Sequence, residues 1–109
     1  MLIDFRAIQD QKVTGMNGGK GDITAKMHVG QCGKIISSKL AKGSSIGLHT
    51  HTTSDDINYV IAGTGKAICD GREELLAAGT CHVCKKGSSH SIVNTGHDDL
   101  VLITVVVER

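Results

Sequence analysis

Three histidines and an acidic pair are the residues of this chain best suited to chemistry. His49 and His51 lie two positions apart, and residues spaced in this way on a β-strand project from the same face. One strand can therefore offer two imidazole nitrogens to a metal ion. His90 and one aspartate of the pair Asp55-Asp56 can complete a set of three nitrogens and one oxygen. Such a set suits Zn, Mn, Fe, Ni or Co better than Ca or Mg.

Length and composition exclude several classes of protein. The 109 residues suffice for one domain with a single core. The formal net charge is +1 and the basic residues are scattered, which argues against a nucleic-acid partner. No apolar run is long enough to span a bilayer, and the first residues lack the pattern of a signal peptide. We therefore expect a cytoplasmic protein with neither nucleic-acid nor membrane partners.

The four cysteines are interpreted as reduced thiols, as is usual inside cells. Cys81 and Cys84 form a C-x-x-C pattern, but Cys32 and Cys69 do not form the second pair that a structural zinc site usually needs. In redox proteins the C-x-x-C pattern lies at the start of a helix. No helical pattern follows Cys84 in this chain. The pattern therefore indicates neither a zinc site nor a redox site.

Short β-branched runs between glycine-rich turns make up most of the chain. There are 14 glycines and no proline, and no apolar stripe with helical spacing. Asp70-Gly71 is the strongest hairpin signal and predicts a type I′ turn. The pattern predicts an all-β sandwich or barrel, with strands over residues 2–8, 23–29, 34–41, 48–51, 57–62, 66–69, 73–77, 80–84, 90–93 and 100–107.

Two motifs give the chain a resemblance to a known family. The first motif reads Gly, five residues, His-x-His, three or four residues, Glu, six residues, Gly, and the second reads Gly, five residues, Pro-x-Gly, two residues, His, three residues, Asn. Over residues 43–63 and 79–94 the matching positions are Gly43, His49, His51, Gly63, Gly79, Gly87, His90 and Asn94. Asp56 stands at the Glu position and Lys85 at the Pro position. In these residues the chain resembles the cupins, and it is similar to their small single-domain members.

The resemblance implies a fold, a cofactor and an assembly. The fold is a double-stranded β-helix, or jelly-roll barrel, as one domain over residues 1–109. One divalent transition metal would be held by His49, His51 and His90. The shorter side chain of Asp56 would ligate directly, bind through a water, or leave the site to the histidines. Cupins often pair through outer strands, so we expect a homodimer with residues 2–8 and 100–107 as candidate interface strands.

Strand alternation places further side chains near the expected site. His82 shares a face with Cys84, which makes it either a core histidine or a catalytic proton-transfer group beside the metal. Asn58 and Val60 share a face with Asp56 and are candidate substrate-binding residues. Lys39 is either a contact for an anionic substrate or a surface lysine. We expect Asn94 to brace a turn, and Tyr59 to point away from the site and pack between the sheets.

The resemblance also bounds the function. Cupins include isomerases, lyases, decarboxylases and dioxygenases as well as proteins that only bind ligands, so the fold alone does not decide the reaction. The first expectation is an enzyme that uses a divalent metal as a Lewis acid on a small oxygenated metabolite, such as a sugar acid or a keto or hydroxy acid. The alternatives are an iron-dependent dioxygenase and a non-catalytic binding or sensing module for a small ligand.

Overall fold

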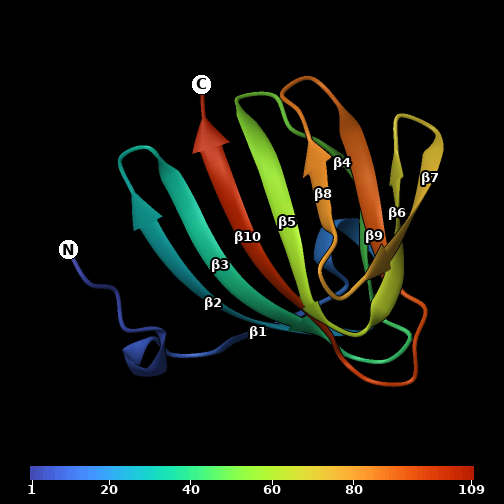
Figure 1. Cartoon of the computed structure of the whole chain (residues 1–109), viewed down its shortest axis with the longest axis horizontal. Helices are drawn as coiled ribbons and strands as arrows, with labels where there is room; N and C mark the ends of the chain where they lie inside the picture. The colour runs from blue at the N-terminus through green and yellow to red at the C-terminus, as the bar shows by residue number, and fades with distance from the viewer.

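Ten antiparallel strands in two facing sheets make up the fold (Figure 1). A computed structural model describes all residues 1–109. The six-stranded sheet has the order β1 (Gln11–Thr14), β2 (Asp22–Gly30), β3 (Gly33–Leu40), β10 (Leu100–Glu108), β5 (Ser54–Ala62) and β8 (Cys81–Cys84). The four-stranded sheet has the order β4 (Ser45–Thr50), β9 (Ser89–Asn94), β6 (Thr64–Cys69) and β7 (Arg72–Ala77). The predicted all-β jelly-roll fold is confirmed.

The hairpin between β6 and β7 shows why local sequence was informative. Asp70 and Gly71 both have positive φ, at 49° and 79°, as the two central residues of a type I′ turn require. Aspartate and glycine tolerate this conformation better than other residues do. The predicted turn is therefore confirmed, and it fixes the register in which Cys69 pairs with Arg72.

A buried apolar cluster fills one end of the space between the sheets. Leu100, Leu40 and Ile23 lie side by side in one cross-strand row of the six-stranded sheet. Each such side chain stabilises the fold by roughly 1.5–3 kcal/mol when fully buried. The complete cluster is Ile23, Leu40, Val60, Ala67, Leu76, Ile92, Leu100 and Leu102. Polar side chains and a cavity occupy the interior beyond it.

Residues 2–8 do not form the predicted strand. They contain a 3-10 turn, η1 (Phe5–Ala7), because the Asp4 carboxylate accepts a hydrogen bond from the Arg6 backbone N–H at 3.0 Å. The second candidate interface strand, β10, lies between β3 and β5 and is hydrogen-bonded on both sides. Neither segment therefore offers an open strand edge for pairing with a second copy.

The outward positions of the six-stranded sheet correct the expectation for Tyr59. Ser54, Asp56, Asn58 and Val60 of β5 are buried, so the odd positions face outward. Tyr59 does point away from the site, but it is 45% exposed on the outer surface and does not pack between the sheets.

The helical segments are the two short 3-10 turns η1 and η2 (Met16–Gly18). Neither has the length or the apolar character that a membrane-spanning helix requires.

Candidate metal centre

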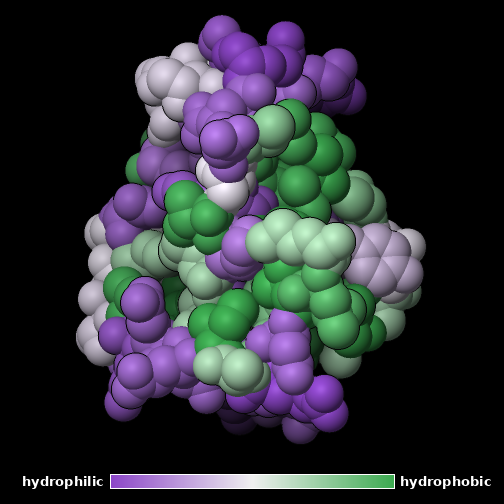
Figure 2. All heavy atoms as spheres, turned by 90° about the vertical axis from the view of Figure 1, so that its left-hand side faces the viewer, coloured by the Kyte–Doolittle hydropathy of each residue, from purple (hydrophilic) through white to green (hydrophobic).

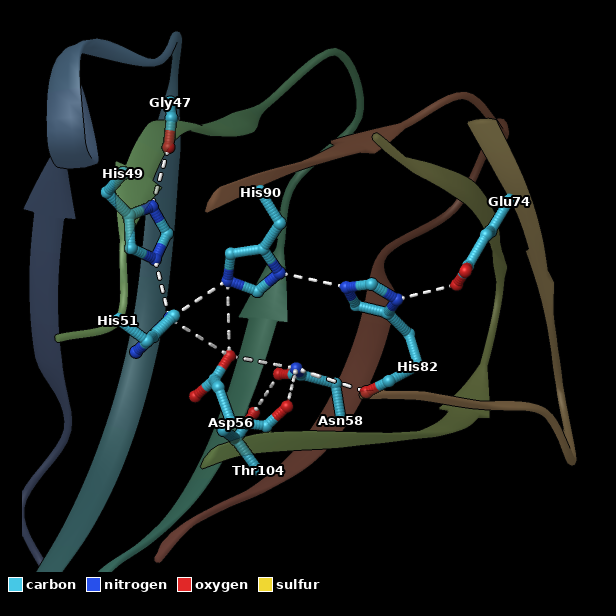
Figure 3. Close-up of polar contacts among 9 residues, drawn as sticks. All are labelled: Gly47, His49, His51, Asp56, Asn58, Glu74, His82, His90 and Thr104. Carbon is cyan, nitrogen blue, oxygen red and sulfur yellow. Dashed lines mark hydrogen bonds and ion pairs between the residues drawn. The ribbon is translucent and has the colours of Figure 1, made fainter. Parts of the chain in front are cut away.

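Three imidazoles converge between the two sheets (Figure 3). The Nε2 atom of His51 lies 3.1 Å from Nε2 of His49 and 3.0 Å from Nε2 of His90. His49 and His90 are direct cross-strand neighbours on β4 and β9, and His51 follows the last residue of β4. The three residues that the two sequence motifs single out are thus brought together at one point.

A bulge in β4 turns these histidines inward. Ile46 pairs with Ile92 and His49 pairs with His90, so β4 has one more residue in this interval than β9. Ile46 and His49 therefore both line the interior, whereas Leu48 between them is 70% exposed. Without the bulge, the alternation that points Ile46 inward would point His49 outward. The His-x-His spacing predicts a shared face, and the bulge decides which face it is.

The bulge also orients one imidazole. Nδ1 of His49 lies 2.7 Å from the carbonyl oxygen of Gly47, which can only accept a hydrogen bond. The proton is therefore on Nδ1, and the lone pair of Nε2 points toward the other two rings. The carbonyl group of the bulge thus prepares His49 to act as a ligand through Nε2.

A second hydrogen-bonded chain reaches the cluster from behind His90. Nδ1 of His82 lies 2.7 Å from the Glu74 carboxylate, and Nε2 of His82 lies 2.8 Å from Nδ1 of His90. Since Glu74 accepts, His82 donates from Nδ1, and its Nε2 can then accept the proton of His90 Nδ1. That arrangement leaves Nε2 of His90 with a lone pair for a metal. In the alternative arrangement His82 donates from both ring nitrogens, so Nδ1 of His90 accepts and Nε2 of His90 donates to Asp56. Metal binding requires the first arrangement, because a nitrogen that binds a metal cannot carry a proton.

Asp56 lies beside the imidazoles on the opposite sheet. Its Oδ2 atom is 3.3 Å from Nε2 of His90 and 3.5 Å from Nε2 of His51. The same oxygen accepts a hydrogen bond of 2.9 Å from the amide of Asn58, whose own oxygen accepts one of 2.8 Å from Thr104. Burial raises the pKa of Asp56, but the hydrogen bonds from His90 and Asn58 outweigh it and hold the pKa below the usual 3.8. Asp56 is therefore an anion that faces the imidazoles.

The donor set fits a divalent transition metal. Two imidazole nitrogens that are each about 2.0–2.1 Å from one ion lie within about 4 Å of each other, and the observed spacings of 3.0 and 3.1 Å satisfy this limit. Converging lone pairs repel one another, and a cation between them removes the repulsion. Imidazole nitrogens suit Zn, Mn, Fe, Ni or Co. The three histidines alone form the cluster, so direct ligation by Asp56 stays a prediction.

A cavity of about 400 Å³ opens beside the three histidines. Asn58 lines it, and its amide donates to Asp56; substrate binding by Asn58 stays a prediction. Three other candidate site residues do not line the cavity. Val60 belongs to the apolar core, and Lys39 is exposed on the outer face of β3, where strand alternation directs it away from the interior. His82 is 1% exposed and contacts His90 from behind, outside the cavity lining.

The structure also accounts for Asn94 and for the C-x-x-C pair. The Asn94 amide donates to the carbonyl groups of Leu40 and Asp98, each at 2.9 Å, which confirms the bracing role. Cys81 is exposed and Cys84 is buried, so the C-x-x-C pair does not present both sulfurs on one face. Burial, with Cys69 nearby, raises the pKa of Cys84 to about 12, which keeps it a thiol and a poor metal ligand.

Glu74 was missed by sequence reasoning, and its removal is expected to weaken metal binding. Glu74→Ala removes the acceptor that holds the His82 proton on Nδ1 and, through it, the orientation of His90. Loss of such an outer partner typically costs about 10–100-fold in metal affinity, and competition titration with a chelating dye measures it. Glu73→Ala on the same strand is the control, because Glu73 forms an ion pair with Lys66 whereas Glu74 is the residue that contacts His82. Equal affinities for the two variants would contradict the prediction.

Acidification is expected to destabilise the metal-free protein. Burial lowers the pKa of His51 from 6.5, and His90 and His49 add to the effect while Asp56 opposes it. The folded state therefore binds this proton less readily than the unfolded state, and stability falls as the pH drops below 6.5. Asp56 acts in the same direction at lower pH, because stability gained from a lowered carboxyl pKa is lost as the carboxylate is protonated. The urea midpoint should be lower at about pH 5.5 than at about pH 7.5; an equal or higher midpoint would contradict this assignment.

Comparison with known proteins gives one family and several relatives. The family model described as "Cupin domain" matches residues 37–106. The "Oxalate-binding protein" of Thermotoga maritima is 32% identical over 114 residues, which cover 98% of this chain and 93% of that protein. The "Pectin degradation protein KdgF" of Dickeya dadantii is 28% identical over 75 residues, 69% of this chain and 68% of that protein.

Solved structures agree with these relatives. The crystal structure of a "predicted oxalate decarboxylase" from Thermotoga maritima superposes with a TM-score of 0.93 at 30% identity, over 100% of both chains. The structure of KdgF from a Halomonas species superposes with a TM-score of 0.76 at 22% identity, over 93% of this chain and 87% of that one. At this lower identity the second match shows the fold alone.

Proposed function

This chain belongs to the cupin family, and on that basis we propose that it is a metal-dependent cupin that acts on a small oxygenated acid. The metal would be a divalent transition ion held by His49, His51 and His90, with Asp56 as the fourth ligand. The acid would bind in the cavity beside it through its carboxylate and a neighbouring oxygen.

One observation carries this proposal: three imidazole Nε2 atoms and an anionic carboxylate meet at the wall of a cavity of about 400 Å³. When bound, a metal at this point would supply Lewis-acid polarisation of a carboxylate or carbonyl oxygen. The names of the Thermotoga maritima relatives support a ligand with adjacent oxygens, of which oxalate is the simplest. Lewis-acid chemistry of the isomerase, lyase or decarboxylase type is the reaction class we propose.

The chain's own residues would position the acid and the metal. Thr104 orients Asn58, and Asn58 orients Asp56, so the carboxylate needs little reorganisation when a ligand enters. Ser38 adds a hydroxyl group to the cavity wall, and this group can donate to an oxygen of the acid that the metal does not hold, whereas the Thr104 hydroxyl already donates its proton to Asn58. A buried hydroxyl group such as that of Ser38 favours a ligand oxygen beside it, because a wholly apolar ligand would leave it unpaired.

A second candidate, binding without turnover, is favoured by a specific observation. His82, the predicted proton-transfer residue, does not line the cavity, and the ionisable side chains that do are the four metal-ligand candidates and, away from them, Lys34 and Glu108. A reaction that needs a general acid beside the metal, in addition to the metal-ligand candidates, finds none among the residues that line the cavity there. This arrangement suits a ligand-holding protein as well as an enzyme whose metal does the activation.

Elemental analysis and one ligand titration test the proposal. Protein purified without chelators or a histidine tag should contain close to one transition-metal ion per chain. Calorimetry should then detect oxalate binding that disappears after dialysis against a chelator. Incubation with ¹³C-oxalate, followed by NMR for formate and carbon dioxide, separates decarboxylation from binding alone. Protein that holds no metal, even after reloading, would refute the proposal.

We also propose that residues 1–109 act as one domain, because both motifs supply the same site, and that two copies form a homodimer. Figure 2 shows apolar side chains gathered among polar ones on the side of the molecule that bears the N-terminus and β2. Here Val29 is 64% exposed, and a surface groove runs over Met1, Ile3, Val29, Ile35 and Val107. Burial of this surface in a second copy would stabilise a dimer. Sedimentation that shows only an 11.4 kDa species at tens of micromolar would refute it.

A further inference from the structure

We propose that the acid bound at this site carries an uncharged aliphatic body in addition to its chelating head, so that a monocarboxylic oxo or hydroxy acid of about five or six carbons fits better than oxalate. This inference rests on the proposed function, since it assigns the head of the ligand to the metal centre. It assigns the body to a wall of the cavity that the metal ligands do not form.

The inner face of the six-stranded sheet changes from polar to apolar along a single cross-strand row. The register places Asn58 of β5 opposite Thr104 of β10, Thr104 opposite Ile36 of β3, and Ile36 opposite Met27 of β2. All four side chains line the cavity. The row begins two residues from Asp56 and ends three strands away, at about 4.8 Å per strand, or roughly 14 Å in all. A ligand whose head lies at the metal centre therefore meets apolar groups as it extends toward β2.

The cavity wall formed by the four-stranded sheet also changes from polar to apolar. Ile46 of β4 precedes the bulge and lines the cavity together with Ile92 of β9, directly beside His49 and His90. Met16, from the turn η2 that packs on β4, closes the same side and is packed against the apolar core. Methionine adapts its shape to aliphatic ligands at low cost. Apolar side chains thus predominate on both walls beyond the metal centre, with the hydroxyl group of Ser38 opposite Ala25 as a polar group among them.

The volume of the cavity exceeds what a compact diacid needs. At about 400 Å³ it lies within the range of roughly 300–1,000 Å³ that is usual for small-molecule sites. A ligand confined to the metal centre would leave water against Ile36, Met27 and Ile46. An aliphatic body would displace that water, and burial of apolar surface favours binding.

Charge excludes a second carboxylate at the apolar end. Among the residues that line the cavity, Lys34 is the only lysine or arginine. It is exposed, and it lies in the neighbouring row, with Val106 between it and Asp56. The cross-strand partners of Met27, Ala25 and Ile23 are the uncharged Ile36, Ser38 and Leu40, so a carboxylate placed against them would lose its hydration without a paired cation. The far end of the ligand should be neutral.

Calorimetry on zinc-loaded protein tests the inference with a series of straight-chain acids. The probes are glyoxylate, pyruvate, 2-oxobutanoate, 2-oxopentanoate and 2-oxohexanoate, with oxalate and 2-oxoglutarate as compact and charged references. We expect affinity to rise about fourfold per added methylene, the value of a buried methylene, and 2-oxoglutarate to bind at least tenfold more weakly than 2-oxopentanoate. Affinity that is constant or falls along the series would overturn the inference.

The outcomes separate this inference from the proposed function. If no acid binds, oxalate included, both fail. If oxalate binds and the longer acids do not, only the aliphatic body is refuted, and the site is specific for a compact diacid.

Two variants of the apolar wall give an independent readout. Ala25→Leu fills the cavity at the β2 end, and Met27→Ser makes the same wall polar. Each should weaken 2-oxohexanoate binding by about fivefold to tenfold while leaving oxalate binding and metal content unchanged. Thr24→Leu is the matched control, since alternation points it to the outer face of the same strand. Equal losses for oxalate and 2-oxohexanoate would contradict the assignment, and the second variant keeps the test informative if one variant fails to fold.

Discussion

Replacement of His51 by alanine is expected to abolish stoichiometric metal binding while the fold is kept. His51 is the imidazole that contacts both of the others, so its loss removes one ligand and leaves the remaining pair without its shared neighbour. The affinity should fall by more than the roughly 100-fold that an outer hydrogen-bond partner can cost. The backbone of His51 stays anchored, because its N–H donates to Ser88 and its carbonyl group accepts from Gly87 whatever the side chain.

Metal content and thermal stability measure this effect together. A ligand present at 100 times its dissociation constant stabilises the folded state by about 2.7 kcal/mol. For a chain of about 100 residues this corresponds to a rise of roughly 10–20 °C in the thermal midpoint. Zinc should produce such a rise in the wild-type protein and not in His51→Ala. His97→Ala, in the exposed turn between β9 and β10, is the control and should behave as wild type; a full metal complement in His51→Ala would refute the site.

Gly47→Ala is expected to lower both metal affinity and stability, although Gly47 offers no side chain to the metal. A methyl group at this position would overlap the carbonyl oxygen of Asn17, a backbone atom of η2 that cannot rotate away. Relief of the overlap must separate η2 from β4 and move the bulge that turns His49 inward. Overpacking of this kind costs about 1–3 kcal/mol, and displacement of His49 should add a loss of metal affinity of at least tenfold.

Leu48→Ala provides the comparison for the bulge. Leu48 lies in the same bulge but is 70% exposed on the outer surface, so its truncation should change stability by less than about 0.5 kcal/mol and leave metal binding intact. Urea unfolding and a chelator competition assay measure both quantities. If Gly47→Ala bound metal as well as Leu48→Ala, the bulge would have no part in positioning His49.

Local patterns predicted most of the strands and the three histidines because each of these depends on near neighbours in the chain. The spacing of His49 and His51 ensures a shared face on any regular strand. The depth of the site was not predictable in the same way, since the inward direction of His49 depends on a bulge relative to β9, some 40 residues away in the sequence. No local feature other than Gly47 indicates that bulge.

The errors have similar causes. Leu2, Ile3, Phe5 and Ile8 read as an apolar strand, but one local hydrogen bond from Arg6 to Asp4 favours a 3-10 turn. Tyr59 was expected between the sheets, and for Lys39 a surface position was one of two alternatives, because the face that a residue occupies depends on the register of the whole sheet. Glu74 and His82 meet because β7 and β8 adjoin across the two sheets, and neither motif contains Glu74. Contacts between strands that are distant in the sequence could thus not be predicted from local sequence patterns.

The division of the cavity between two groups of strands has an evolutionary consequence. The metal is assigned to side chains of β4, β5 and β9 and to His51 just after β4, whereas the apolar wall on the six-stranded sheet comes from β2 and β3. Substitutions at Ala25, Met27 or Ile36 can therefore change the length and polarity of the accepted ligand without touching a metal ligand or its hydrogen-bond partners. Descendants of such a chain can diverge in substrate while they inherit the reactive centre intact, so that preference for a ligand would drift faster among relatives than the chemistry applied to it.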